Sequence, residues 1–155
     1  MIRLSRLTDY AVALLSQMGR SEPDHLWAAS SLSEISDLPM PTVAKVLKLL
    51  AKSGVIKATR GAAGGYKLTR SIAQISIADI IEAMDGPISI TDCARGRDQS
   101  DCSVQDICPV SDGWHRVNNI VRKALADVSL AEISESSAPL DRREDITEQR
   151  QATGQ

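Results

Sequence analysis

Aromatic residues are scarce in this chain: its 155 residues include two Trp, two Tyr and no Phe. A buried core must therefore be built from Leu, Ile, Val and Ala. No run of about 18 apolar residues occurs, so we expect no membrane-spanning helix and no membrane partner. The N-terminal stretch carries Asp9 within its apolar part and lacks a small-residue cleavage site, unlike a secretory signal peptide. We expect a cytoplasmic protein.

Cysteine is also scarce, and all three cysteines lie in one polar stretch, 92–109, with the sequence DCARGRDQSDCSVQDICP. An odd number of clustered cysteines is not the pattern of a secreted protein held together by disulfides. The chain length suits one domain with an appended element. The cysteine stretch is therefore the first feature that needs an explanation.

Acidic residues are missing from one part of the chain. The formal net charge is −2, which by itself predicts no polyanionic partner. Residues 40–70, however, contain no Asp or Glu. Their basic residues are Lys45, Lys48, Lys52, Lys57, Arg60, Lys67 and Arg70. A basic stretch inside a mildly acidic chain indicates a surface for nucleic acid.

Hydrophobic spacing predicts several helices in the first half of the chain. We expect a helix capped by Thr8 and ended by Gly19, then a short helix over 28–36. The sequence Asp-Leu-Pro at 37–39 breaks the chain, because the residue before a proline avoids the helical region. Pro41 suits the first position of the next helix. The apolar stripe of that helix comprises Val43, Val46, Leu47 and Leu50.

The second half continues with a hairpin and further helices. The β-branched segment 55–60 and the segment 66–68 flank a glycine turn, which predicts a β-hairpin. Ser76 caps another helix, and a long amphipathic helix follows over 111–131. Apolar residues become sparse from position 134, so we expect a disordered tail.

The order of these elements is that of a winged helix-turn-helix: a short helix, a tight break, a second helix and a hairpin. The second helix buries its apolar stripe and presents Thr42, Lys45 and Lys48 to the major groove of DNA. Arg60 meets a phosphate or enters a groove, and the glycines after it let the backbone approach DNA. A lysine-rich helix face alone is more often a solvated surface, and a Gly-Gly pair alone is more often a plain turn. The prediction therefore depends on the ordered combination of these elements. The predicted DNA-binding residues are Pro41, Thr42, Lys45, Lys48, Arg60, Gly61, Gly64, Gly65 and Tyr66.

The spacing C-x8-C-x5-C over Cys93, Cys102 and Cys108 indicates a metal site. A disulfide leaves one thiol over and is disfavoured in the cytoplasm, and a catalytic thiol needs a base beside it. Zinc and an iron–sulfur cluster both suit thiolate ligands. The gaps are wider than the C-x2-C pairs of structural zinc sites, which mildly favours a cluster. Candidates for a fourth ligand are Asp9, Asp112, His115 and a backbone or solvent group.

Several segments are characteristic in combination: LTDYAVALL, PMPTVAKVLKLLAKSGVI, RGAAGGYKL, ISIADIIEAMDGPI and CPVSDGW. With the three-cysteine stretch, they resemble the IscR/NsrR family of iron–sulfur winged-helix transcription regulators over about residues 1–131. The segments ITDC and CSVQDICPV and the Trp-containing helix after them look most like the branch that regulates the Suf cluster-assembly operon.

This resemblance implies a homodimer in which the helix over 111–131 forms much of the interface. Cys93, Cys102 and Cys108 match the family's cluster ligands, with [2Fe–2S] preferred and [4Fe–4S] as the other form. The implied function is a transcription regulator, a repressor, that binds double-stranded operator DNA. It would sense iron–sulfur cluster status and control Suf assembly genes.

Two departures from the family concern the cluster. The gap between Cys93 and Cys102 is longer than in the IscR branch, and Ser111 stands where that branch has a ligating histidine. The nitric-oxide-sensing branch uses an aspartate of the first helix, reaching across the dimer. Asp9 matches it and is the leading fourth ligand. The alternatives are a regulator with structural zinc, a nitric-oxide or redox sensor, and a cluster carrier that does not bind DNA.

The sequence thus predicts four parts. They are a winged helix-turn-helix domain over 1–86, a cluster-binding loop over 87–110, a dimerisation helix over 111–133 and a disordered tail over 134–155. No nucleophile–base pair or carboxylate pair with suitable spacing is apparent, so we expect no enzymatic activity.

Overall fold

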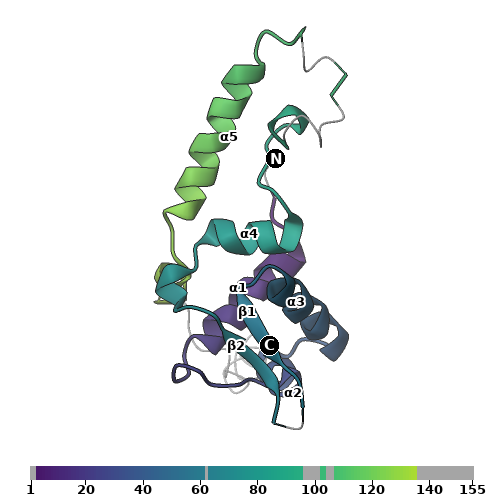
Figure 1. The fold of residues 1–155 in the computed structure, drawn as a ribbon, viewed down its shortest axis with the longest axis vertical. Coiled ribbons are helices and arrows are strands. Elements are labelled where there is room, and N and C mark those ends of the chain that lie inside the picture. The colour runs from purple at the N-terminus through teal and green to yellow at the C-terminus, as the bar shows by residue number, and fades with distance from the viewer. Residues whose placement is uncertain (1–2, 62, 96–101, 104–106, 136–155) are drawn as a thin grey trace, which may run out of the picture.

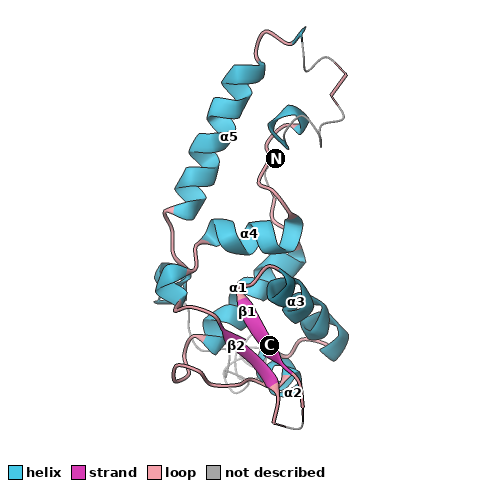
Figure 2. Cartoon of the chain, viewed as in Figure 1, coloured by secondary structure: helices cyan, strands magenta, loops and turns pink. Residues whose placement is uncertain are grey.

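The computed structural model describes residues 3–61, 63–95, 102–103 and 107–135. Within them the fold is mainly α with one antiparallel hairpin, which confirms the predicted fold class (Figures 1 and 2). The elements are α1 (Arg6–Met18), α2 (Ala29–Ser36), α3 (Met40–Lys52), β1 (Ile56–Thr59), β2 (Gly65–Leu68), η1 (Ile72–Gln74), α4 (Ile77–Asp85), η2 (Asp92–Arg95), α5 (Ser111–Ala126) and α6 (Leu130–Glu135).

Helix α1 begins earlier than predicted. Ser5 is its N-cap, and the Ser5 Oγ accepts a hydrogen bond from the Thr8 N–H at 3.2 Å. Thr8, the predicted cap, lies inside the helix, is fully buried, and donates its hydroxyl to Asp85 Oδ2 at 2.7 Å. Both hydroxyl side chains are suitable caps, so local propensity could not decide between them. The contact with Asp85 favours Ser5 as the cap, because the Thr8 hydroxyl is then free to join α1 to the end of α4.

The helix-turn-helix break lies between α2 and α3. Asp37 ends α2 in a left-handed conformation with φ of 55°, and Pro39 precedes α3. Pro41 occupies the second helical position and not the predicted first one. It costs no hydrogen bond there either, because the first four N–H groups of a helix have no partner within it. The predicted stripe of α3 is fully buried, as Val43, Val46, Leu47 and Leu50.

The predicted hairpin is present, and the backbone at Trp27 pairs with its second strand. Strands β1 and β2 pair in antiparallel register, with Thr59 opposite Gly65 near the turn. The Trp27 N–H donates to the Tyr66 oxygen and the Tyr66 N–H to the Trp27 oxygen, both at 2.8 Å. The approach is so close that a Cβ on Gly65 would lie 2.7 Å from the Trp27 oxygen. The segment before α2 therefore fixes the outer strand of the hairpin.

A core of aliphatic side chains holds α1, α3, α4 and β1 together, as the shortage of aromatic residues predicts. Its fully buried members include Leu14, Leu15, Leu47, Leu50, Ile56, Ile75 and Ile80. Helix α4 begins with a capping box: the Ser76 Oγ accepts from the Asp79 N–H at 3.1 Å, and the Asp79 carboxylate accepts from the Ser76 N–H at 3.0 Å. The predicted cap at Ser76 is confirmed.

The single helix predicted over 111–131 is wrong. Helix α5 ends at Ala126, because the backbone beyond it pairs with the segment before α4. The Ile77 N–H donates to the Val128 oxygen at 2.9 Å, and the Leu130 N–H donates to the Ile75 oxygen at 2.8 Å. In Figure 1, α5 runs beside η2 as a long arm, and α4 lies between this arm and the other helices.

Helix α6 then returns the chain to the core. Leu130 is fully buried, and the buried Ser134 donates its hydroxyl to Ser16 Oγ of α1 at 2.8 Å. Position 134, where the tail was predicted to start, is thus part of the packed structure, since a polar side chain can be buried when its hydrogen bonds are satisfied. The remainder of the predicted tail, 136–155, lies outside the described residues. Within the part that the structure describes, no helix has the length and hydropathy of a membrane span.

Candidate DNA-binding surface and cysteine site

Helix α3 presents the predicted basic face to solvent. Pro41, Lys45 and Lys48 are exposed and Thr42 is half-buried, while the opposite side of the helix forms part of the core. Positions three or four residues apart share a helix face, so these side chains form one surface. The helix N-terminus lies at its Pro41 end, where unpaired N–H groups favour an anion such as a phosphate.

The hairpin lies beside α3 and carries the other predicted DNA-binding residues (Figure 1). Arg60 and Gly61 are exposed, and Gly64, Gly65 and Tyr66 are half-buried. Gly61 has φ of +116°, a conformation that L side chains rarely adopt. A Cβ on Gly64 would lie 2.2 Å from the Thr59 oxygen. The turn therefore requires glycine for its own geometry, and that requirement holds whether or not DNA approaches it.

The three cysteines are all described, and none forms a disulfide. Cys93 lies in η2, is 8% exposed, and its Sγ lies 3.2 Å from Thr91 Oγ1. Cys102 and Cys108 are half-buried, and the Cys108 oxygen accepts a hydrogen bond from the Ser111 N–H at the start of α5. The cysteine segment, residues 91–110, therefore contains η2 near its start and ends where α5 begins.

The donor set fits a thiolate-bound group, because three soft sulfur ligands in one segment suit an iron–sulfur cluster or zinc. Among the described residues, however, no three His, Cys, Asp or Glu side chains lie close enough to hold one metal ion. The chemistry of the cysteine segment thus fits such a group, while the described positions do not form its coordination sphere.

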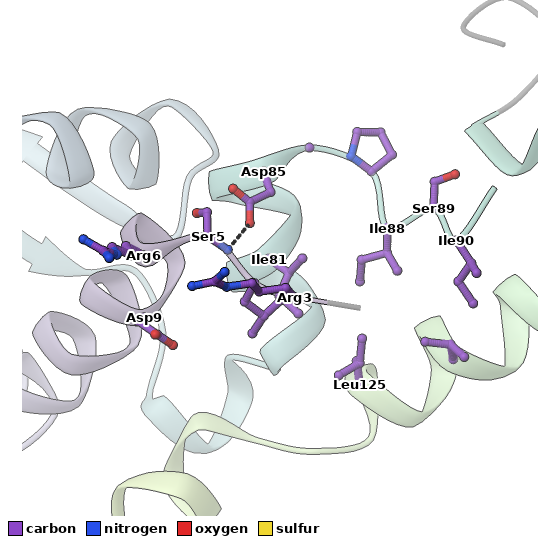
Figure 3. A pocket seen from close by; sticks show the side chains of 14 residues that line it. Arg3, Ser5, Arg6, Asp9, Ile81, Asp85, Ile88, Ser89, Ile90 and Leu125 are labelled. Carbon is purple, nitrogen blue, oxygen red and sulfur yellow. Dashed lines mark hydrogen bonds between the residues drawn. The ribbon is translucent and has the colours of Figure 1, made fainter. Parts of the chain in front are cut away.

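The candidate fourth ligands lie in two places. Asp112 is exposed and His115 is half-buried, both near the start of α5. Asp9 is exposed on α1 and lines a cleft of about 830 Å³ between the start of α1, the segment 86–90 and α5 (Figure 3). In one chain, Asp9 thus shares a cleft with the residues that precede the cysteine segment, such as Ile90.

The same cleft contains Asp85, which accepts hydrogen bonds from the Thr8 hydroxyl and, at 3.4 Å, from the Ser5 N–H (Figure 3). Partial burial opposes ionisation of this carboxyl. The hydrogen bonds from Thr8 and Ser5 outweigh that effect and hold the pKa of Asp85 below its ordinary value. Asp85 is therefore a charged link between α4 and the start of α1.

Sequence reasoning missed the residue that attaches α5 to the cysteine segment. Asn118 is 6% exposed; its Oδ1 accepts from the Ile90 N–H at 3.0 Å and its Nδ2 donates to the Ile88 oxygen at 3.1 Å. An asparagine next to an apolar stripe of a helix was the available signal, but spacing alone does not distinguish a buried amide from a surface one.

Helix α5 exposes several large apolar side chains to solvent. Its large exposed apolar side chains, together with the residue before the helix, are Val110, Trp114, Val117 and Ile120. They recur three or four residues apart and so form a stripe along the arm. An exposed apolar stripe of this kind marks an interaction surface.

Known proteins share both this sequence pattern and this fold. The pattern of the Rrf2 family, described as iron-dependent transcriptional regulators, matches residues 4–136. The HTH-type transcriptional regulator IscR of Xenorhabdus nematophila is 25% identical over 140 residues, which cover 90% of this chain and 84% of that protein.

Solved structures agree on the fold. CymR, the global cysteine regulator of B. subtilis, superposes with a TM-score of 0.64 at 21% identity, covering 89% of this chain and all of CymR. IscR of T. potens superposes with a TM-score of 0.60 at 22% identity, covering 95% of this chain and 96% of that one. The family pattern spans the helix-turn-helix, the hairpin, the cysteine segment and α5, and we conclude that the chain is a transcriptional regulator of the Rrf2 family.

Proposed function

We propose that the protein is a homodimeric repressor that binds operator DNA through α3 and the hairpin and responds to an iron–sulfur cluster on its three cysteines. The observation that carries this proposal is the position of the cysteine segment. It connects the head (residues 6–85, α1 to α4 with the hairpin), which bears the DNA-binding surface, to the arm α5, which bears the exposed apolar stripe.

DNA binding is supported by the surface of α3. Thr42 and Lys45 lie on the exposed side near the N-terminus of the helix, the end that enters the major groove in helix-turn-helix proteins. Lys48 and Arg60 add positive charge for phosphates, and Pro41, Gly61, Gly64, Gly65 and Tyr66 shape the surface. Membership of a family of transcriptional regulators supports the same assignment.

A homodimer is supported by the stripe on α5. Two copies that bury Trp114, Val117 and Ile120 against each other remove these side chains from water, and a twofold axis lets one patch cover its own copy. Two heads held about 34 Å apart would then read two half-sites of a pseudo-palindromic operator.

The cluster assignment rests on Cys93, Cys102 and Cys108 as ligands. When bound, an iron–sulfur cluster supplies a redox- and nitric-oxide-sensitive centre whose stability depends on the cell's iron and sulfur supply. The preferred form is [2Fe–2S], with the partner subunit's Asp9 as the fourth ligand. The resemblance to regulators of Suf assembly genes supplies the candidate targets.

The mechanism follows from the connections of the cysteine segment. Drawing the three thiols together would fix Cys93 of η2 relative to Cys108 next to the start of α5, and so would set the angle between the arm and the head. A small change in that angle alters the spacing of the two heads relative to one helical turn of DNA. A coupling free energy of about 1–3 kcal/mol between the two sites is enough for a usable switch.

The test compares DNA affinities of three samples: anaerobically reconstituted protein, apo protein and reconstituted Cys102→Ala. The probe is a duplex selected from a random pool by the reconstituted protein. We expect apo protein and Cys102→Ala to share one affinity, which differs from that of the reconstituted protein. Equal affinities in all three samples would contradict cluster sensing, and failure to select any duplex would contradict sequence-specific DNA binding.

A further inference from the structure

Resting on the proposed function, we propose that Asn118 is the residue through which a change in the cysteine segment reaches the dimer face of α5. All residues of α5 are described, and Asn118 is the one buried residue among them. The first three turns of α5 thus expose Trp114, Val117 and Ile120 and bury a polar residue, which is the reverse of the usual pattern of a helix. The reversal is explained by what the Asn118 amide contacts.

The Asn118 amide binds the backbone on both sides of Ser89. It accepts a hydrogen bond from the Ile90 N–H at 3.0 Å and donates one to the Ile88 oxygen at 3.1 Å. An uncharged amide donates from its nitrogen and accepts at its oxygen, as a peptide group does, so Asn118 pairs with this backbone in the way a neighbouring β-strand would. Two contacts to the backbone fix both the position and the rotation of α5 against the residues that precede Cys93.

The cysteine segment is therefore attached to α5 at two points. At its far end, Cys108 is joined to α5 by the chain itself and by the hydrogen bond from the Ser111 N–H. At its near end, Cys93 follows Ile90 by three residues, and Ile90 is held by Asn118. Seven residues of helix, about 10 Å at 1.5 Å per residue, separate the two attachment points on α5.

Half of the proposed dimer face lies between these attachment points. Trp114 and Val117, both exposed, lie between Ser111 and Asn118. A rearrangement that brings the cysteines together pulls on both ends of this stretch of α5, so it turns or shifts the apolar stripe. Without Asn118 the two hydrogen bonds of the near attachment are lost, and only the packing of η2 against α5 remains there. A rearrangement of the cysteine segment then moves α5 less. Asn118 is thus a positioning residue and binds neither DNA nor the cluster.

The variants follow from this geometry. Asn118→Leu keeps the branched arrangement of four heavy side-chain atoms and removes both hydrogen bonds. Asn118→Asp keeps an acceptor for the Ile90 N–H but cannot donate to the Ile88 oxygen when ionised, which covers the case in which the leucine variant does not fold. The matched control is Arg122→Gln, one turn further along α5. Arg122 instead binds Glu82 of α4, at 2.6 and 3.2 Å.

The first measurement is hydrogen–deuterium exchange on apo protein, which needs no cluster. We expect faster exchange of the amides over 88–93 in Asn118→Leu and Asn118→Asp, and unchanged exchange there in Arg122→Gln. Unchanged exchange over 88–93 in both Asn118 variants would overturn the proposal, whatever the outcome for the cluster.

The second measurement is the ratio of DNA affinities with and without the cluster, on the selected duplex. If the wild-type ratio lies within the usual range for coupled sites, about 5- to 150-fold, we expect it to fall below about 2-fold in the Asn118 variants and to persist in Arg122→Gln. The variants should still take up the cluster, judged by visible absorption. A wild-type ratio near one would refute cluster sensing itself, whereas a preserved ratio in the Asn118 variants would refute the role of Asn118 alone.

Discussion

The large apolar side chains of the head are mostly buried, whereas several of those on the arm are exposed. In the head, Leu14, Leu47 and Ile80 are fully buried. In the arm, Trp114 is 41% exposed and Ile120 is 60% exposed. A packed interior stabilises a fold within one chain, whereas an exposed apolar stripe needs a second surface to cover it. The comparison supports the proposal that a second copy covers the stripe of the arm, whereas the apolar core of the head is already buried within one chain.

A charge on the open stripe of the arm should have the largest effect. Ile120→Asp places a carboxylate in the proposed dimer interface, where burial of an unpaired charge is strongly unfavourable. We expect a monomer, and because the two heads no longer bind together, DNA affinity falls by a factor of about 100 or more. Sedimentation velocity gives the mass and fluorescence anisotropy the affinity.

The matched control for this charge is Asn119→Asp, an exposed position on the side of α5 opposite Trp114 and Val117. The same carboxylate there should leave the dimer intact. A dimeric Ile120→Asp protein would contradict the assignment of the stripe to dimerisation.

Truncating an apolar side chain should lower the free energy of unfolding more in the head than in the arm. Leu47→Ala opens a cavity in the core and should lower the free energy of unfolding by about 2–5 kcal/mol, measured by urea denaturation. In the monomeric Ile120→Asp background, Val117→Ala should cost less than about 0.5 kcal/mol, because Val117 is then in water in both states. A large cost for Val117→Ala would mean that the Val117 side chain packs within its own chain.

On the exposed face of α3, the effect of a lysine-to-alanine change on DNA binding should depend on the position of the lysine along the helix. Lys45→Ala should weaken DNA binding by about 1–3 kcal/mol if Lys45 reads a base, or reduce the salt slope by about 1 if it meets a phosphate. Lys52→Ala, at the far end of the same helix, should change neither quantity as much. Salt titrations of the DNA affinity of both variants make this comparison. Equal losses in the two variants would contradict an approach to DNA led by the N-terminus of α3.

The smallest expected effect concerns the link between α4 and α1. The pKa of Asp85 is lowered in the folded protein, so its ionised form stabilises the fold above the pKa of the unfolded chain. That stabilisation is lost as the pH falls through the folded pKa, below about pH 4. Asp85→Asn should therefore be less stable than wild type near pH 7, and the difference should shrink towards pH 3. Urea denaturation at both pH values tests this, and a difference independent of pH would contradict it.

The sequence predicted the head well because its signals are local. The α3 stripe at Val43 and Leu47, the cap at Ser76 and the glycine turn each depend on residues near one another along the chain. The errors arose where distant residues compete. Thr8 looks like a cap, but its contact with Asp85, 77 residues away, places it inside the helix.

The arm was harder to predict for the same reason. The break after Ala126 reflects backbone pairing of 128–130 with 75–77, which helical spacing does not reveal. Asn118 was missed because its partners are backbone atoms 28 and 30 residues away. The metal site at the cysteines stays a prediction, which rests on residue type alone, since thiolates crowded into a polar stretch suit a metal ion or a cluster.

The central claim, an iron–sulfur cluster on the cysteine segment, is tested most directly by anaerobic purification with absorption spectroscopy and quantitation of iron and sulfide. We expect a coloured protein with charge-transfer bands and iron and sulfide in equal amounts, and a colourless Cys102→Ala variant. A colourless wild-type protein that contains zinc, or no metal, would contradict the claim.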